Sequence, residues 1–152
     1  MKTTFFISLL LVFSLVSCDR SAFRVSLNGG VFEKKFSFDC GSVEISGAVL
    51  SNHQTHASLR FNLDNPVLIN PEKLEITHKG EILTAIIDLH ERGKARQRMQ
   101  EARMISGNDG IGIEINRIVH AGDTMKINID NFILCHDKPL EIGDINLIFV
   151  VR

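Results

Sequence analysis

Residues 56–63 read HASLRFNL, and apolar residues alternate with polar ones along the whole stretch. One face would carry Ala57, Leu59, Phe61 and Leu63, and the other His56, Ser58, Arg60 and Asn62. A repeat of two residues is the repeat of a β-strand, whose side chains point alternately to opposite faces. The stretch therefore predicts a strand with one face in the core and one face in water.

The same alternation recurs along the rest of the chain. The apolar residues of these further runs are Val43 and Ile45; Ile111, Ile113 and Ile115; Met125, Ile127 and Ile129; and Ile145, Leu147, Phe149 and Val151. Turn-forming residues separate the runs at Asn28-Gly29-Gly30, Asn65-Pro66, Asn70-Pro71, Lys79-Gly80, Asn108-Asp109-Gly110, Gly122-Asp123 and Lys138-Pro139. Many short strands with regular turns predict an all-β fold, and we expect an antiparallel β-sandwich because two apolar sheet faces fill one another.

Length and composition set the number of domains. The chain has 152 residues, of which 44% are hydrophobic and 23% charged, as in an ordinary globular protein. We expect one sandwich domain over residues 23–152. The rhythm of the C-terminal half loosely resembles the immunoglobulin-like domains of exported bacterial proteins: Gly122-Asp123 leads a strand, and Lys138-Pro139-Leu140 separates two runs. The chain has no Trp and no Tyr for the conserved core positions of a true immunoglobulin domain, so we predict the sandwich and not that family.

The N-terminus has the pattern of an export signal. Lys2 precedes the apolar run FFISLLLVFSLV at residues 5–16, which is too short to span a bilayer comfortably. The run ends in Leu15-Val16-Ser17-Cys18, which resembles the lipobox of bacterial lipoproteins. The resemblance implies a signal peptide over residues 1–17, lipidation of Cys18 and a short tether over residues 18–22. A secretory signal that happens to contain Cys, or an uncleaved anchor, is the alternative.

Two further cysteines follow, Cys40 and Cys135. If Cys18 carries lipid, they form an even pair in a compartment where thiols are oxidised, so a Cys40–Cys135 disulfide is one hypothesis. Two buried free thiols that pack as small apolar side chains are the other.

Residues 90–103, HERGKARQRMQEAR, interrupt the strand pattern with five basic and two acidic residues. The residues after Gly93 favour helix by propensity, and we expect a long hairpin tip with a helical turn. Arg92, Lys94, Arg96 and Arg98 are candidates for binding anionic headgroups or an acidic partner near the membrane. A solvated hairpin tip without a partner is the alternative.

Several classes of function are disfavoured by composition. The formal net charge is −1, and −2 once Lys2 is removed with the signal, which gives no general attraction for nucleic acid. Without Trp or Tyr, the chain lacks the usual aromatic platform for sugars. His53 and His56 would face opposite sides of a strand, and we expect no metal site or cofactor. Neither a nucleophile elbow nor a carboxylate pair is recognisable, so we expect no catalytic residue.

These patterns together predict a lipid-anchored protein of the bacterial cell envelope, at the outer membrane rather than the inner one. We expect a non-catalytic module for binding, assembly or surface structure, with a possible protein partner in the envelope. The alternative is an envelope enzyme or metal-binding protein whose site is built from loops.

Overall fold

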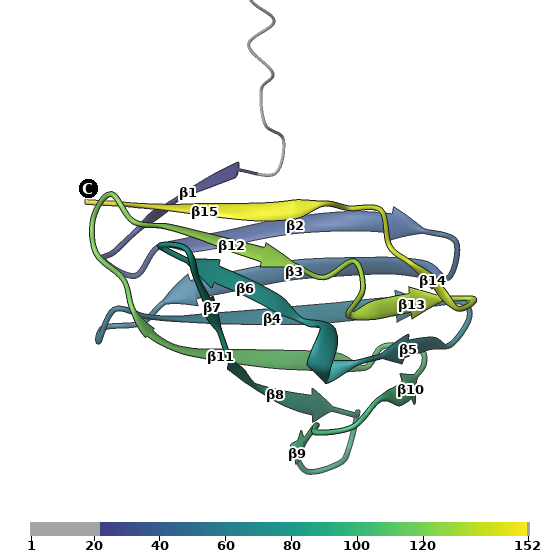
Figure 1. Cartoon of the computed structure of the whole chain (residues 1–152). Helices are drawn as coiled ribbons and strands as arrows, with labels where there is room; N and C mark the ends of the chain where they lie inside the picture. The colour runs from purple at the N-terminus through teal and green to yellow at the C-terminus, as the bar shows by residue number, and fades with distance from the viewer. Residues whose placement is uncertain (1–21, 152) are drawn as a thin grey trace, which may run out of the picture.

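The computed structural model describes residues 22–151, which form two layers of β-sheet (Figure 1). The lipobox and Cys18 lie outside the described residues. One layer is a six-stranded sheet in the order β2-β3-β4-β11-β8-β9. Its strands are β2 (Val31–Phe38), β3 (Gly41–Val49), β4 (Gln54–Leu63), β11 (Gly110–Ile118), β8 (Ala85–His90) and β9 (Gln97–Arg98), all paired antiparallel.

The second layer consists of a five-stranded and a four-stranded sheet. The five-stranded sheet has the order β1 (Ala22–Ser26), β15 (Asp144–Val150), β12 (Thr124–Asn128), β6 (Glu75–His78) and β7 (Glu81–Leu83). The four-stranded sheet has the order β10 (Arg103–Ile105), β5 (Val67–Ile69), β13 (Ile133–Cys135) and β14 (Lys138–Pro139). The chain runs from β5 through the short 3-10 helix η1 (Pro71–Lys73) into β6, and from β12 into β13. The same two chain segments therefore pair in both sheets of this layer, as β6–β12 in the five-stranded sheet and as β5–β13 in the four-stranded sheet.

The predicted β-sandwich is therefore confirmed, with one departure from antiparallel pairing. β1 runs parallel to β15, and Ala22 to Ser26 lie beside Asn146 to Val150. The first described strand thus adds to the edge of a sheet that the last strand also forms.

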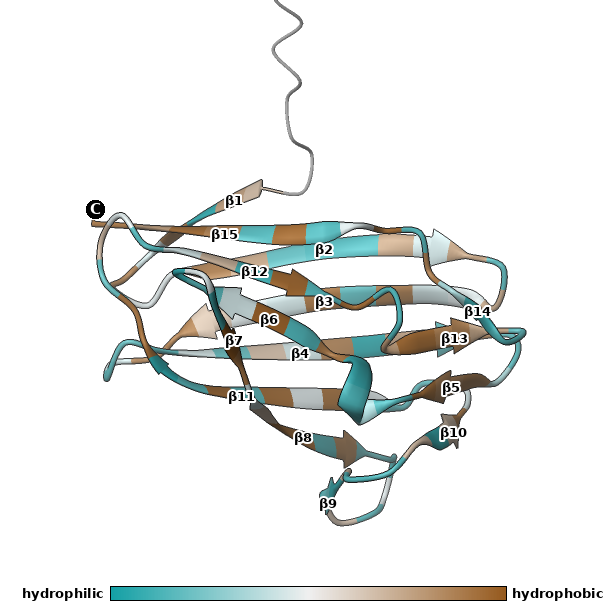
Figure 2. Ribbon diagram, in the orientation of Figure 1, coloured by the Kyte–Doolittle hydropathy of each residue, from teal (hydrophilic) through white to brown (hydrophobic). Residues whose placement is uncertain are grey.

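The core is one cluster between the layers, and the alternation of apolar residues shows along the ribbons in Figure 2. The predicted inward residues are all buried except Val151, which is 67% exposed and lies one residue beyond the end of β15. The prediction was wrong at that residue.

Gly47 shows how close the packing is inside the six-stranded sheet. A Cβ at this position would overlap the ring of Phe32 and lie 2.6 Å from the carbonyl oxygen of His56. Glycine at residue 47 and alanine at its cross-strand neighbour Ala57 therefore leave the space that the buried Phe32 ring fills.

Two local predictions also differ from the structure. Segment 90–103 contains no helical turn: a turn after β8 leads into β9 and then β10. The backbone N–H of Met99 instead donates to the carbonyl of Ile87, and the Met99 side chain is buried, so sheet pairing overrides helix propensity. The turn expected at Lys138-Pro139 lies at His136-Asp137, both with positive φ, as in a two-residue hairpin.

Candidate functional site

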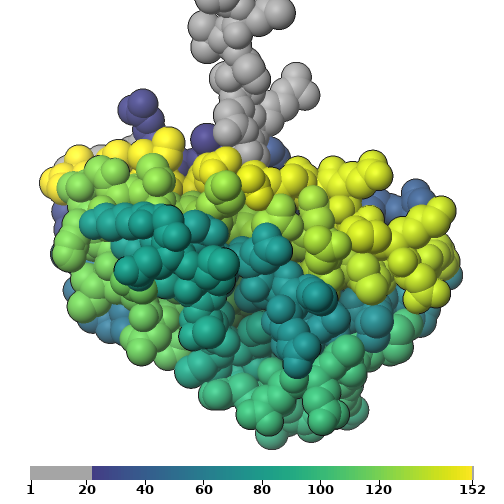
Figure 3. Space-filling model, viewed as in Figure 1, coloured from purple at the N-terminus to yellow at the C-terminus, as the bar shows by residue number. Residues whose placement is uncertain are grey.

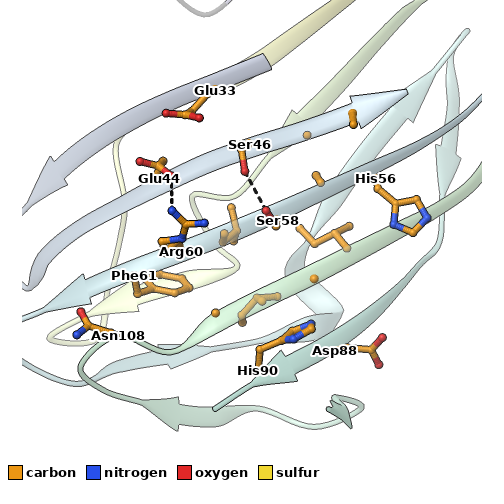
Figure 4. A pocket seen from close by; sticks show the side chains of 18 of the residues that line it. Glu33, Glu44, Ser46, His56, Ser58, Arg60, Phe61, Asp88, His90 and Asn108 are labelled. Atoms are coloured by element: carbon orange, nitrogen blue, oxygen red, sulfur yellow. Dashed lines mark hydrogen bonds and ion pairs between the residues drawn. The ribbon is translucent and has the colours of Figure 1, made fainter. Parts of the chain in front are cut away.

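The outward face of the six-stranded sheet is hollowed into a trough of about 1020 Å³, drawn in Figure 4. Residues of β2, β3, β4, β11 and β8 line it, together with the turn after β8. Figure 3 views the molecule from the other layer, where side chains of β6, β12 and β15 form the surface. The trough therefore belongs to one layer only.

Small residues form the floor of the trough. Ser46, Ser58 and Gly112 lie side by side on β3, β4 and β11, and Ala48 and Gly110 are next to them. Ser46 Oγ and Ser58 Oγ are hydrogen-bonded at 2.9 Å (Figure 4). Because these side chains are short or absent, the floor runs across the strands rather than along them.

Charged side chains form the walls. On one side, Arg60 Nη1 donates to Glu44 Oε1 at 3.4 Å across β4 and β3. On the other side His56 and Glu114 are cross-strand neighbours on β4 and β11. The floor row starts beside Glu33 on β2.

The far end of the trough is built by β8 and the turn that follows it. Asp88 is 12% exposed and accepts a hydrogen bond from Arg98 Nε at 3.1 Å. Arg96 Nε donates to His90 Nε2 at 3.0 Å and lies 3.6 Å from Asp88 Oδ2. Gly112 lies beneath this group, since a Cβ there would be 3.1 Å from His90 Nε2 and 3.3 Å from an Arg96 Nη2.

The structure separates the four basic residues singled out in segment 90–103. Arg92 and Arg96 line the trough. Arg98 is paired with Asp88, and Lys94 Nζ lies 3.1 Å from Glu91 Oε2, which Arg103 also approaches at 3.7 Å. Asp88 and Glu91 thus offset much of the positive charge, and the segment is a network of ion pairs rather than a uniformly basic surface.

Cys40 and Cys135 are joined as a disulfide, with a Cα–Cα distance of 5.9 Å and a sequence separation of 95. The bond links the β2–β3 turn of one layer to β13 of the other. The ligand atoms of His136 and the two cysteines lie within 4.8 Å of one another. In the oxidised chain both sulfurs are used by the disulfide.

A second polar cluster is buried at the end of the five-stranded sheet, away from the trough. His78 Nε2 lies 3.0 Å from Asp123 Oδ2, and Lys79 Nζ lies 2.8 Å from Asp123 Oδ1. Burial alone would raise the pKa of Asp123, but hydrogen bonds from Lys79, the His120 backbone and His78, with the Lys79 charge, lower this pKa to about 2. This cluster was not predicted, because Asp123 lies 45 residues from His78 in the sequence and the two meet only through strand pairing.

The trough was not predicted either, although a signal for half of it was present. His56, Ser58, Arg60 and Asn62 were assigned to the polar face of one strand, and all four line the trough. The alternation within one strand does not show which strands lie beside it. The sequence therefore does not predict that Glu44 on β3 and Gly112 on β11 are neighbours of β4.

No family model matches this chain, and no curated protein or solved structure is significantly similar to it. Within residues 22–151, no helix has the length and apolar character needed to cross a membrane.

Proposed function

We propose that this protein is a non-catalytic binding module, held at the bacterial cell envelope by lipid on Cys18, and that the trough is its ligand-binding face. The observation that carries the proposal is the trough itself. Ligand sites are concave and combine a shaped surface with a few convergent polar groups, and here serine, histidine, arginine and carboxylate side chains converge over a floor of small residues.

The sheet order supports an accessible trough on an anchored protein. β1, which follows the tether, adjoins β2, whereas β8 and β9 form the opposite side of the six-stranded sheet. A lipid at Cys18 would hold the β1–β2 side near the anchor, and β8 and β9 lie at the opposite side of the molecule (Figure 1). In this orientation segment 90–103 would lie away from the anchoring membrane. We therefore favour a ligand that approaches from the side opposite that membrane over lipid headgroups.

A bulky residue in the floor tests this proposal. Ser58 is exposed at the centre of the trough, so the large side chain of Ser58→Trp would fill the trough. Trp is common in β-strands, so the strand should still form. The matched control is Thr77→Trp on the outward face of β6, in the other layer. Both variants and the parent protein would be applied to an array of neutral oligosaccharides, acidic oligosaccharides, and acidic and basic peptides.

We expect the parent protein and Thr77→Trp to bind at least one of these classes and Ser58→Trp to lose that binding, with all three proteins melting within a few degrees of one another. Binding that survives in Ser58→Trp, or a parent protein that binds no class on the array, would overturn the proposal.

A further inference from the structure

We infer that the ligand of the trough is a linear glycan with carboxylate-bearing sugars, and that Arg60 and Arg96 bind a carboxylate between them. The inference rests on the proposed function and adds the chemistry of the ligand. The feature behind it is a gap in the charged walls above Gly110 of β11, beside the His90 and Arg96 side chains that cover Gly112.

Gly110 lies between Arg60 on β4 and His90 on β8 in the sheet register. Strands are spaced at about 4.8 Å, so the two flanking backbones are roughly 10 Å apart with no side chain between them. Arg60 borders this gap on one side, and the His90–Arg96 pair borders it on the other. Figure 4 shows Arg60 and His90 on either side of β11. Arg60 bonds Glu44 on β3, on the far side of β4 from this gap, so a rotation of the exposed Arg60 side chain toward Gly110 would bring its guanidinium to the gap opposite Arg96.

Both guanidinium groups keep donors for a ligand. The Arg60 side chain is 79% exposed, and its contact with Glu44 is a single 3.4 Å hydrogen bond through Nη1. Arg96 is 57% exposed, and its Nε donates to His90 and lies 3.6 Å from Asp88 Oδ2, which leaves the two Nη groups for a ligand. Each guanidinium has five N–H donors in a fixed plane, and charge-assisted bonds to carboxylates are the strong ones. An arriving carboxylate would find unused donors on both sides of the gap.

The open sheet face favours a glycan over a peptide. Backbone N–H and C=O groups of the central strands are already used in the sheet ladders, so a peptide lying on this face would find no backbone partners of the kind that a free strand edge supplies. Sugar hydroxyls both donate and accept, and the trough offers Ser46, Ser58, Asn62, Asn108 and carboxylates to meet them. From β2 to β8 the floor crosses four strand spacings, about 19 Å, which suits an elongated polymer.

A carboxylate on the sugar would also compensate for the absence of Trp and Tyr from this chain. Sugar sites commonly use the flat face of Trp or Tyr, and this chain has neither. A pair of guanidinium groups supplies the missing affinity only if the sugar is negatively charged. The inference therefore predicts discrimination between an acidic glycan and its neutral counterpart.

The probes are tetrasaccharides of galacturonic, glucuronic and mannuronic acid, each with its methyl ester as the uncharged counterpart. The variants are Arg60→Gln/Arg96→Gln and the control Lys73→Gln/Lys138→Gln, whose two lysines are exposed and outside the trough. Both double variants lower the net charge by two, so a general electrostatic effect would appear equally in each. Affinities would be measured by titration calorimetry on the full mature domain at low and high salt.

We expect at least one acid to bind, its ester to bind at least tenfold more weakly, and Arg60→Gln/Arg96→Gln to raise the Kd for the acid by about tenfold or more. The lysine control should leave the Kd within about twofold, because exposed charges outside the site are screened. Absence of binding by all three acids, equal binding of acid and ester, an equal loss in the lysine control, or tighter binding of tetraglutamate would overturn the inference. Binding of an ester that Ser58→Trp abolishes would leave the proposed function standing while the acidic-glycan inference falls.

Discussion

At the scale of single residues, Asp123 is a buried carboxylate that several neighbours hold in its charged form. Its side chain is 8% exposed, and its two oxygens meet His78, Lys79 and the backbone N–H of His120. His78 Nδ1 is buried without a hydrogen-bond partner in the described part of the chain. The imidazole of His78 is therefore held through its Nε2 contact with Asp123. We expect removal of the carboxylate charge to destabilise this end of the five-stranded sheet.

The lowered pKa of Asp123 predicts how stability responds to acid. Because its pKa falls from an ordinary 3.8 to about 2 on folding, the charged form favours the folded state. This stabilisation is fully present above about pH 4 and is lost as the pH falls toward 2. We expect it to be roughly 1 to 2 kcal/mol, since solvent screens the exposed Lys79 ammonium. Urea unfolding of the parent and Asp123→Asn between pH 2 and pH 6 measures it.

Asp64→Asn is the control for this prediction, because Asp64 is an exposed carboxylate. The difference in unfolding free energy between parent and Asp123→Asn should shrink as the pH is lowered, whereas Asp64→Asn should track the parent. A difference that stays constant from pH 6 to pH 2 would show that the Asp123 charge does not stabilise the fold.

At the scale of elements, the sequence predicts strands well where one face is buried and the other is wet. β4, β11, β12 and β15 alternate cleanly and were predicted residue by residue, apart from Val151. β2 was missed, because Lys34 occupies an inward position among Phe32, Phe36 and Phe38. Its ammonium lies 5.2 Å from the centre of the Phe36 ring and 5.9 Å from that of Phe23, so the lysine is accommodated by aromatic faces that no alternation pattern reveals.

Sheet order and the trough could not be predicted, for a related reason. The pattern within one strand fixes which residues face outward, but the neighbours of that strand depend on pairing between distant segments. Arg60 meets Glu44 sixteen residues earlier, and Gly110 fifty residues later. A site built across five strands depends on this pairing. The site predicted from the sequence, segment 90–103, therefore includes only one end of the trough.

The disulfide between Cys40 and Cys135 is an element-scale feature with a measurable effect. It joins two residues that are 95 apart in sequence, for which the chain-entropy model gives about 4 to 5 kcal/mol of stabilisation. We expect reductant to lower the urea midpoint of the parent protein markedly. Cys40→Ser/Cys135→Ser should have the lower midpoint from the outset and show no response to reductant. Identical midpoints for the parent with and without reductant would contradict the prediction.

At the scale of the whole molecule, the first described strand, β1, adjoins the β2 side of the six-stranded sheet, and β8 and β9 lie on its opposite side. β1 begins at Ala22, four residues after Cys18, so a lipid at Cys18 would hold the β1–β2 side close to the bilayer. The Arg96 end of the trough would then be the outermost part. A ligand in the surroundings would meet this end first.

Replacing Cys18 tests the anchor. Cys18→Ser removes the thiol that would carry lipid, and several acyl chains are what makes such anchoring stable. We expect the variant to lose labelling by radioactive palmitate and to leave the membrane fraction, while Cys40→Ser keeps both properties. A Cys18→Ser protein that still takes up palmitate and still shifts to mature size would exclude lipidation at this residue.

The parallel pairing of β1 with β15 has a consequence for biogenesis. In a chain that is translocated with its N-terminus first, β1 emerges about 120 residues before β15, the strand with which it pairs, and Cys40 emerges 95 residues before Cys135. Contacts between such distant segments form slowly. If the chain is exported as proposed, native closure at both places waits for the last part of translocation, and until then the emerging chain presents an unpaired strand and a free thiol to chaperones and oxidases of that compartment. A chain that ends before β15 would leave β1 without the strand that it pairs with in the folded domain.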